Sequence, residues 1–250
     1  MHILLTNDDG IHAPGIRALC DALVAAGHRV SVCAPDQERS AASHSVTLGR
    51  PLHPKPARVP GAQRAWAVDG TPADCASLGL YLTREDPADL VIAGINWGMN
   101  LGGAAVYSGT VASAMEASMC GVQALAVSLC VKDWEHPADF SAAARLAAHV
   151  VPWVVDHPLP LGALYSLNVP ALPYDQLKGI VAATLAPVFL DEPNYARAED
   201  GGWRYRGIAR PFEGEDYDLV KADAGYCTLT KLTWDFRMPE GDDELNGIGL

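Results

Sequence analysis

The chain has 250 residues, of which 30 are acidic and 18 basic, and its net charge is −12 with a pI near 4.9. A chain of this length can bury a large core and fits one α/β domain with an appendage. Its acidity argues against binding of long nucleic acid, because such binding depends on many lysine and arginine contacts to phosphate. A small phosphorylated ligand stays compatible if a metal ion and backbone amides supply local positive potential.

Membrane segments and disulfides are not expected. The sequence has no apolar run long enough to span a bilayer, and its N-terminus lacks the basic, apolar and small-residue order of a signal peptide. We therefore expect a cytoplasmic protein with no membrane partner. The cysteines form no C-x-x-C pair and lie mostly in apolar stretches, which predicts reduced core thiols. They are Cys20, Cys33, Cys75, Cys120, Cys130 and Cys227.

Strand and helix patterns alternate from the N-terminus onward. An apolar strand begins at His2, a helix with apolar residues at helical spacing follows at 14–26, and residues 29–34 alternate like a strand. This β-α-β order implies a parallel strand pair with a right-handed crossover. A polar loop follows at 35–43, and irregular strands and loops are expected from there to about Arg64.

The alternation continues beyond this irregular region. Thr71, Pro72 and Asp74 are typical of a helix N-terminus, so Asp74 is predicted to cap the helix rather than to act in catalysis. Further strands are expected at 88–93, 124–129 and 163–169, and further helices at 108–120 and 140–151. The pattern predicts an α/β fold with a doubly wound, mostly parallel, three-layer Rossmann-like sheet, in which residues 1–186 form the core.

The composition changes after Pro187, where acidic and aromatic residues mix with glycine. Residues 187–250 are therefore predicted to form a β-rich C-terminal extension of the same single domain. Its strand-like stretch at 225–234 lies outside the α/β alternation. A lone hairpin is marginal in water and exposed strand edges invite pairing, so we expect this arm to pack on a neighbouring subunit of a homodimer or homotetramer. Tyr226 and Trp234 suit such an interface.

Two adjacent carboxylates, Asp8 and Asp9, follow the first strand directly, and Gly10 after them permits close approach of an ion. Ligands of α/β sheets bind beyond the carboxyl ends of strands. Neighbouring carboxylates repel unless a cation or a proton relieves them, and a divalent metal is the simplest remedy. The alternative is that the pair caps a helix, although the next helix signal, Pro14, comes several residues later.

Oxygen donors follow two other predicted strands. Ser40 lies in the loop after the second strand, and Asn96 follows the strand at 88–93. Because parallel strands end at one edge of the sheet, Asp8, Asp9, Ser40 and Asn96 could hold one ion. Their oxygens suit Mg²⁺ or Mn²⁺ better than zinc. Serine and asparagine also occur in ordinary loops for turn geometry, so each donor alone is weak evidence.

Ser108, Gly109 and Thr110 stand at the head of a helix of small residues. Exposed amides at a helix start carry partial positive charge and bind phosphate, and hydroxyls add hydrogen bonds. The alternative is that these hydroxyls simply cap the helix. The nearby Gly94-x-Asn96-x-Gly98 lacks the full G-x-G-x-x-G pattern, which argues against a nicotinamide cofactor.

Three further side chains are candidates for an acid or base catalyst. His12 lies close to the aspartate pair and could donate a proton, and His44 follows the serine loop. Both could equally be ordinary loop residues. Glu116, within the helix after Thr110, is expected to be a partly buried, hydrogen-bonded residue rather than an acid catalyst.

Five motifs occur in order along the chain: Asn7-Asp8-Asp9-Gly10-x-His12-Ala13-Pro14-Gly15, Ala34-Pro35-Asp36 with Arg39-Ser40, Gly70-Thr71-Pro72-x-Asp74-Cys75, Gly94-Ile95-Asn96-x-Gly98-x-Asn100 and Tyr107-Ser108-Gly109-Thr110-Val111. Together they resemble the motifs of the survival protein E (SurE) family of 5′/3′-nucleotidases. The resemblance implies a metal-dependent acid phosphatase acting on nucleoside monophosphates. It further implies one divalent ion per subunit on Asp8, Asp9, Ser40 and Asn96, phosphate binding by the Ser108 turn, and a C-terminal arm exchanged between subunits.

The chain departs from the family pattern at about 191–218, and Lys231 stands where the family usually has proline. This departure bears on substrate preference and oligomer detail rather than on the metal residues.

The hypothesis is in-line attack of water on a phosphomonoester, with Asp8, Asp9 and Asn96 as catalytic groups and Ser108, Gly109 and Thr110 holding the phosphate oxygens. A covalent aspartyl phosphate stays open. The alternative from another class is a nucleotide- or polyphosphate-binding sensor without turnover. A nucleotide-sugar glycosyltransferase would use a similar aspartate pair, but the sequence offers no evident acceptor site.

Overall fold

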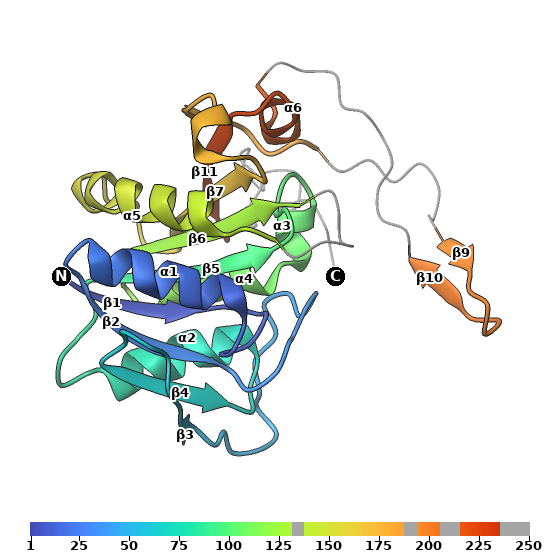
Figure 1. The fold of residues 1–250 in the computed structure, drawn as a ribbon. Helices are drawn as coiled ribbons and strands as arrows, with labels where there is room; N and C mark the ends of the chain where they lie inside the picture. Colours follow the sequence, from blue (N-terminus) through green and yellow to red (C-terminus); the bar gives the residue numbers. More distant parts are fainter. Residues whose placement is uncertain (132–137, 188–194, 206–215, 236–250) are drawn as a thin grey trace, which may run out of the picture.

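The computed structural model describes residues 1–131, 138–187, 195–205 and 216–235. A nine-stranded sheet forms the centre of this part of the chain, in the order β3-β4-β2-β1-β5-β6-β7-β11-β8 (Figure 1). Its strands are β1 (His2–Thr6), β2 (Arg29–Pro35), β3 (Lys55–Pro56), β4 (Arg64–Val68), β5 (Leu90–Trp97), β6 (Ala124–Cys130), β7 (Ala163–Pro170), β8 (Ile180–Ala182) and β11 (Cys227–Thr233). From β4 to β7 all neighbouring strands are parallel.

Helices cover both faces of the sheet, as Figure 1 shows. Ile3 and Leu5 of β1 belong to one buried cluster, whereas Leu4 belongs to the cluster on the other face, because successive side chains of a strand point to opposite sides. The helices are α1 (Pro14–Ala25) and α5 (Ser141–Asp156) on the first face, α2 (Pro72–Leu82) and α4 (Gly109–Met119) on the second, and the short α3 (Ala104–Tyr107), η1 (Tyr174–Gln176) and α6 (Asp218–Asp223). The predicted doubly wound α/β fold is confirmed.

The direction of sheet growth reverses at β1. After β1, the chain adds β2 and β4 on one side and then crosses to place β5, β6 and β7 on the other. Strand β1 is parallel to both β2 and β5. In open α/β sheets the crevice at such a reversal, beyond the carboxyl ends of the strands, is where ligands bind. The aspartate pair follows β1 directly at this position.

The predicted helix start at Thr71 is confirmed. The Thr71 side chain accepts a hydrogen bond from the Asp74 amide, while Asp74 Oδ2 accepts one from the Thr71 amide at 2.9 Å. The Asp74 carboxylate also accepts bonds from the amide and hydroxyl of Thr47, at 3.0 and 2.6 Å. Asp74 therefore caps α2 and fastens the preceding loop, as its sequence context predicts.

Two element bounds differ from the predictions. Strand β5 continues to Trp97, so Asn96 lies within its last residues rather than in a loop after 88–93. Helix α5 continues through Pro152 to Asp156, because Val154 beyond the proline is still fully buried against the sheet. Burial of this face outweighs the helix-disrupting tendency of proline.

The strand-like stretch predicted at 225–234 is β11, whose strand partners lie within the chain, whereas packing of the C-terminal arm on a neighbouring subunit stays a prediction. β11 pairs antiparallel with β7 and parallel with β8 in the same chain. The reason is that β7 would otherwise leave an open edge, which β11 covers with its buried residues Cys227 and Leu232.

A separate hairpin of β9 (Tyr195–Arg197) and β10 (Trp203–Tyr205) projects away from the sheet in Figure 1. The exposed Tyr195 and Trp203 lie on it. The hairpin belongs to the same C-terminal arm as Tyr226 and the exposed Trp234, and packing of this arm on a neighbouring subunit stays a prediction. Among the described helices, none has the length and apolar character required to cross a bilayer.

The cysteine prediction holds in the structure. All six thiols are free, and all except the exposed Cys120 are buried.

Candidate functional site

The aspartate pair lies in a tight turn at the end of β1. Asp8 is only 4% exposed, and Asp9 is partly buried. The Asn7 side chain donates a hydrogen bond to the Gly10 carbonyl at 2.9 Å, which closes the turn. Gly10 has a φ of +96°, and an added Cβ would lie 3.1 Å from the Gln37 carbonyl carbon. Glycine is therefore required here both for its backbone conformation and for the close approach of the next loop.

The start of α4 faces the same aspartates. The Thr110 hydroxyl donates a hydrogen bond to Asp8 Oδ1. A Cβ added at Gly109 would lie 2.8 Å from the Asp8 Cβ and 3.0 Å from its Oδ2. Ser108 Oγ accepts a hydrogen bond from the Val111 amide at 3.0 Å and so caps the helix. The predicted phosphate turn and the predicted metal carboxylate thus lie in direct contact.

Both carboxylates are held in surroundings that oppose their charge. Burial raises the pKa of Asp8, although the Thr110 hydroxyl and the amides of Thr110 and Gly109 act in the opposite direction. Burial and the neighbouring Asp8 raise the pKa of Asp9 to about 7, against a lowering effect of the Trp97 amide and with a further raising effect of Glu38. The pair therefore carries unrelieved negative charge when it is ionised.

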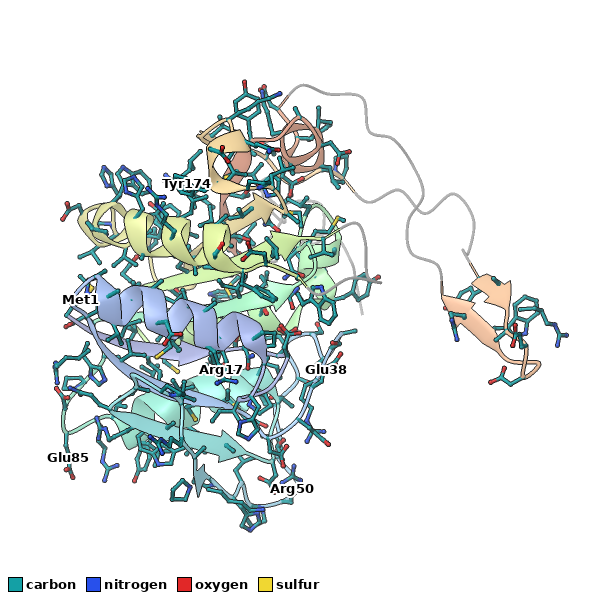
Figure 2. All side chains as sticks on the ribbon, viewed as in Figure 1. Met1, Arg17, Glu38, Arg50, Glu85 and Tyr174 are labelled. Atoms are coloured by element: carbon teal, nitrogen blue, oxygen red, sulfur yellow. The ribbon has the colours of Figure 1, made fainter. Side chains whose placement is uncertain are left out.

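The loop after β2 reaches this turn through its backbone. The Arg39 amide donates a hydrogen bond to the Asp8 carbonyl at 2.7 Å, which places the next residue, Ser40, beside the aspartates. Ser40 is exposed, and its hydroxyl donates to Glu38 Oε1 at 2.5 Å. In Figure 2, Glu38 lies at the end of the sheet toward which the arrows of β1 and β2 point in Figure 1, and Met1 lies at the opposite end.

The end of β5 carries Asn96, the last of the four predicted metal residues. The Trp97 amide donates a hydrogen bond to Asp9 Oδ2 at 3.0 Å, so the preceding Asn96 also lies beside the pair. The Asn96 amide nitrogen donates to the Gly98 carbonyl at 2.9 Å. Strand register shifts between Ala93 and Asn96, where an added Cβ at Gly94 would lie 2.3 Å from the Val127 carbonyl oxygen. This irregularity lies directly before Trp97, which contacts the aspartate turn.

These residues fit a divalent cation. None of the described Lys, Arg or His side chains forms an ion pair with Asp8 or Asp9. Asn7 Oδ1, next to the pair, is buried and has no partner among the described groups. The described residues contain no group of three or more His, Cys, Asp and Glu side chains arranged for a metal ion. Two carboxylates with hydroxyl and amide oxygens match a hard cation rather than zinc.

Two of the other candidate residues, His44 and Glu116, line one pocket together with Ser108. His44 Nε2 lies 2.9 Å from Glu116 Oε2, so these two residues pair with each other, and Glu116 has the hydrogen-bonded role that its position predicts. His12 is exposed in the turn between β1 and α1.

Asn7 and Glu38 belong to the site but were not among the predicted site residues. Asn7 closes the aspartate turn, and its place directly before two aspartates and a glycine is a signal that could have found it. Glu38 bonds Ser40 and adds negative charge near Asp9. No local pattern distinguishes it from an ordinary acidic loop residue.

Known protein families and proteins similar to this chain identify its family. The model of the family described as "Survival protein SurE" matches residues 3–190. The chain belongs to the SurE family. It is 43% identical to a 5′-nucleotidase SurE of Aeromonas hydrophila over 94% of this chain and 93% of that protein. A 5′-nucleotidase SurE of Nitrosococcus oceani is also 43% identical, over 99% of this chain and 97% of that protein.

A solved structure supports the same assignment. The crystal structure of the SurE protein from Aquifex aeolicus superposes with a TM-score of 0.79 at 33% identity, over 95% of each chain. The family resemblance inferred from the five sequence motifs is confirmed, and the α/β fold is that of this neighbour.

Proposed function

We propose that this protein is a divalent-metal-dependent phosphomonoesterase that hydrolyses nucleoside 5′- and 3′-monophosphates to nucleoside and phosphate. The observation that carries the proposal is the contact between the aspartate turn and the first turn of α4, through Thr110 and Gly109. An acidic pair that suits a cation and helix amides that suit an anion are thus adjacent at the reversal point of the sheet. Both kinds of group can stabilise the charge that develops when a phosphate ester is hydrolysed.

The similar proteins support the substrate class. The relatives from Aeromonas hydrophila and Nitrosococcus oceani are named 5′-nucleotidases, which favours nucleoside 5′-monophosphates. Activity on 3′-monophosphates follows from the resemblance to the family of 5′/3′-nucleotidases.

In the proposed mechanism, four residues would hold the metal ion and the start of α4 would bind the phosphate. Asp8, Asp9, Ser40 and Asn96 would hold one Mg²⁺ or Mn²⁺ ion. Such an ion would supply positive charge that offsets the phosphate charge and favours ionisation of the attacking water. Gly109 lacks a side chain, so the start of α4 can approach Asp8 closely, which would bring a phosphate bound at the helix start next to the ion.

The two hydroxyls and one carboxylate complete the mechanism. Ser108 Oγ accepts from the Val111 amide and keeps its O–H donor for the phosphate, whereas Thr110 donates its O–H to Asp8 and would have to exchange that partner to donate to the phosphate. A preorganised donor of this kind contributes about 3–4 kcal/mol. One aspartate carboxylate accepts the proton of the water that attacks in line with the leaving oxygen.

A substrate panel tests this function. Protein freed of metal by chelation is assayed for phosphate release from 5′-AMP, 3′-AMP and glycerol 2-phosphate, with and without Mg²⁺ or Mn²⁺. We expect release only with the ion. Asp8→Asn and Asp9→Asn should each lower the rate on the order of 100-fold or more. Asp21→Asn, an exposed aspartate on α1, is the matched control and should act like the parent protein.

The rival function is a nucleotide- or polyphosphate-binding sensor without turnover. It predicts tight binding of nucleotide with no release of phosphate in this panel. Ser108→Ala and Thr110→Ala separate phosphate binding from simple helix capping. In the proposed enzyme each should raise the inhibition constant of inorganic phosphate about tenfold, or about 1.4 kcal/mol. Unchanged constants would assign the Ser108 hydroxyl to helix capping alone and the Thr110 hydroxyl to its contact with Asp8 alone.

A further inference from the structure

The loop between Asn96 and Ser108 connects the proposed metal residues with the proposed phosphate turn, and buried polar groups hold it. The Asn100 amide donates to Asn168 Oδ1 at 2.9 Å, and its side-chain nitrogen donates to Ser128 Oγ at 2.8 Å. Asn100 is 6% exposed, Asn168 1% and Ser128 fully buried. These contacts fasten the first half of the loop to β6 and β7. Buried polar groups that are all paired fix one arrangement of the backbone.

The second half of the same loop is held from the C-terminal part of the chain. Asp218, only 1% exposed, accepts a hydrogen bond at Oδ2 from the Gly102 amide at 2.7 Å. Its Oδ1 accepts bonds from the amides of Ala186 and Leu219, at 2.9 and 2.8 Å. Gly102 has a φ of +51°, and a Cβ added there would lie 3.0 Å from the Ala186 carbonyl oxygen. The loop is therefore tight against this attachment point.

The attachment point is also where the C-terminal extension leaves and rejoins the sheet. The Thr184 amide donates to the Asp216 carbonyl at 3.0 Å, and the Asp218 amide donates to the Thr184 carbonyl at 2.9 Å. These bonds form an isolated bridge between Thr184 and Tyr217. The Asp218 carboxylate thus joins three segments: the chain after β8 at Ala186, the first turn of α6 at Leu219, and the loop of the candidate site at Gly102.

We propose that Asp218 is a positioning residue of the phosphatase, whose carboxylate fixes Gly102 and thereby the spacing between Asn96 and the Ser108 turn. The inference rests on the proposed function and deepens it, because it assigns a role in catalysis to the base of the extension. A displacement of the loop would move the start of α4 relative to the aspartates, and small misplacements of binding groups lower catalytic rates strongly.

Asp218→Asn is a selective test. The asparagine retains one acceptor oxygen, and this oxygen should stay on the side where the amides of Ala186 and Leu219 donate to it. The NH₂ group of the asparagine then faces the Gly102 amide. Two donors face each other there, so the bond to the loop is lost while the base of the extension keeps its partner. Asp216→Asn is the matched control, because Asp216 lies at the same base with its side chain 93% exposed and paired with Lys221.

We expect Asp218→Asn to weaken binding of inorganic phosphate in the presence of Mg²⁺ at least tenfold by calorimetry. We also expect it to lower kcat/KM for 5′-AMP at least tenfold, through both kcat and KM, with an unchanged circular dichroism spectrum. Hydrogen exchange in residues 98–105 should accelerate in the variant and not in Asp216→Asn. A purely structural residue would lower Tm without changing these constants well below Tm, and that result would overturn the proposal.

Ser128→Ala is a second test of the loop. It removes the oxygen that accepts the Asn100 side-chain hydrogen bond in the first half of the loop, and it leaves the contacts of Asp218 unchanged. We expect the same loss of phosphate binding and of kcat/KM. Phosphate affinity equal to that of the parent in both variants would refute the positioning role. If the parent protein binds phosphate but releases none from any ester, the proposed function fails, whereas the phosphate affinities of the variants still decide the role of Asp218.

Discussion

Replacement of Asp9 by asparagine should stabilise the metal-free protein while abolishing its activity. The pKa of Asp9 is raised from 3.8 to about 7 by burial and by Asp8. At about 1.36 kcal/mol per pH unit, this rise corresponds to at most about 4 kcal/mol of unfavourable free energy in the ionised folded state. Solvent reaches this partly buried carboxylate and reduces the effect, so we expect about 2 kcal/mol.

The substitution removes this charge and keeps the local contact, because the asparagine oxygen can still accept the hydrogen bond from the Trp97 amide. For a chain of 250 residues, about 2 kcal/mol corresponds to a rise in Tm of about 4–8 °C. The assay is thermal unfolding followed by circular dichroism at pH 8 in the presence of a chelator, with Asp21→Asn as the control.

The metal dependence of Tm completes the experiment. Millimolar Mg²⁺ should raise the Tm of the parent protein, because an ion that binds only the folded state stabilises it. It should leave Asp9→Asn almost unchanged. A variant that is less stable than the parent in chelator, or one that gains as much stability from Mg²⁺, would refute the electrostatic reasoning.

Asp74→Ala should lower the free energy of unfolding by about 2–4 kcal/mol at pH 7, measured by urea denaturation, because it loses a helix cap and charge-assisted hydrogen bonds. Burial acts to raise the pKa of Asp74, but the hydrogen bonds of the carboxylate hold this pKa below 3.8. The ionised carboxylate therefore stabilises the fold fully above pH 3.8, and the stability difference between variant and parent should shrink as the pH falls below 3.8. Gly109→Ala should reduce phosphatase activity on the order of 100-fold, because its Cβ would collide with Asp8, whereas Gly49→Ala, in open space, should retain activity. Light scattering should report a dimer or tetramer whose mass falls when a short glycine-serine linker replaces residues 188–215; a full-length monomer would contradict the oligomer prediction.

The sequence alone was sufficient for the α/β class and for most elements of the core. Local patterns specify these features: apolar strands such as residues 2–6, helical spacing after Pro14, and the cap formed by Thr71 and Asp74. The motifs also identified the family. Turn and helix-start chemistry depends on neighbours in the chain, so Asp8, Gly10 and Thr110 could be assigned to strand-end and helix-start positions without knowledge of the packing.

Only the tertiary structure decided which segments meet. The contact of Thr110 with Asp8 spans 102 positions in the chain, and that of Gly102 with Asp218 spans 116. No local pattern encodes such pairs, because each depends on the strand order and on the register of distant elements. The same reason explains why the sequence did not predict the partners of β11. Its alternating residues predict a strand correctly, but the open edge of β7 that it fills exists only after the sheet has assembled.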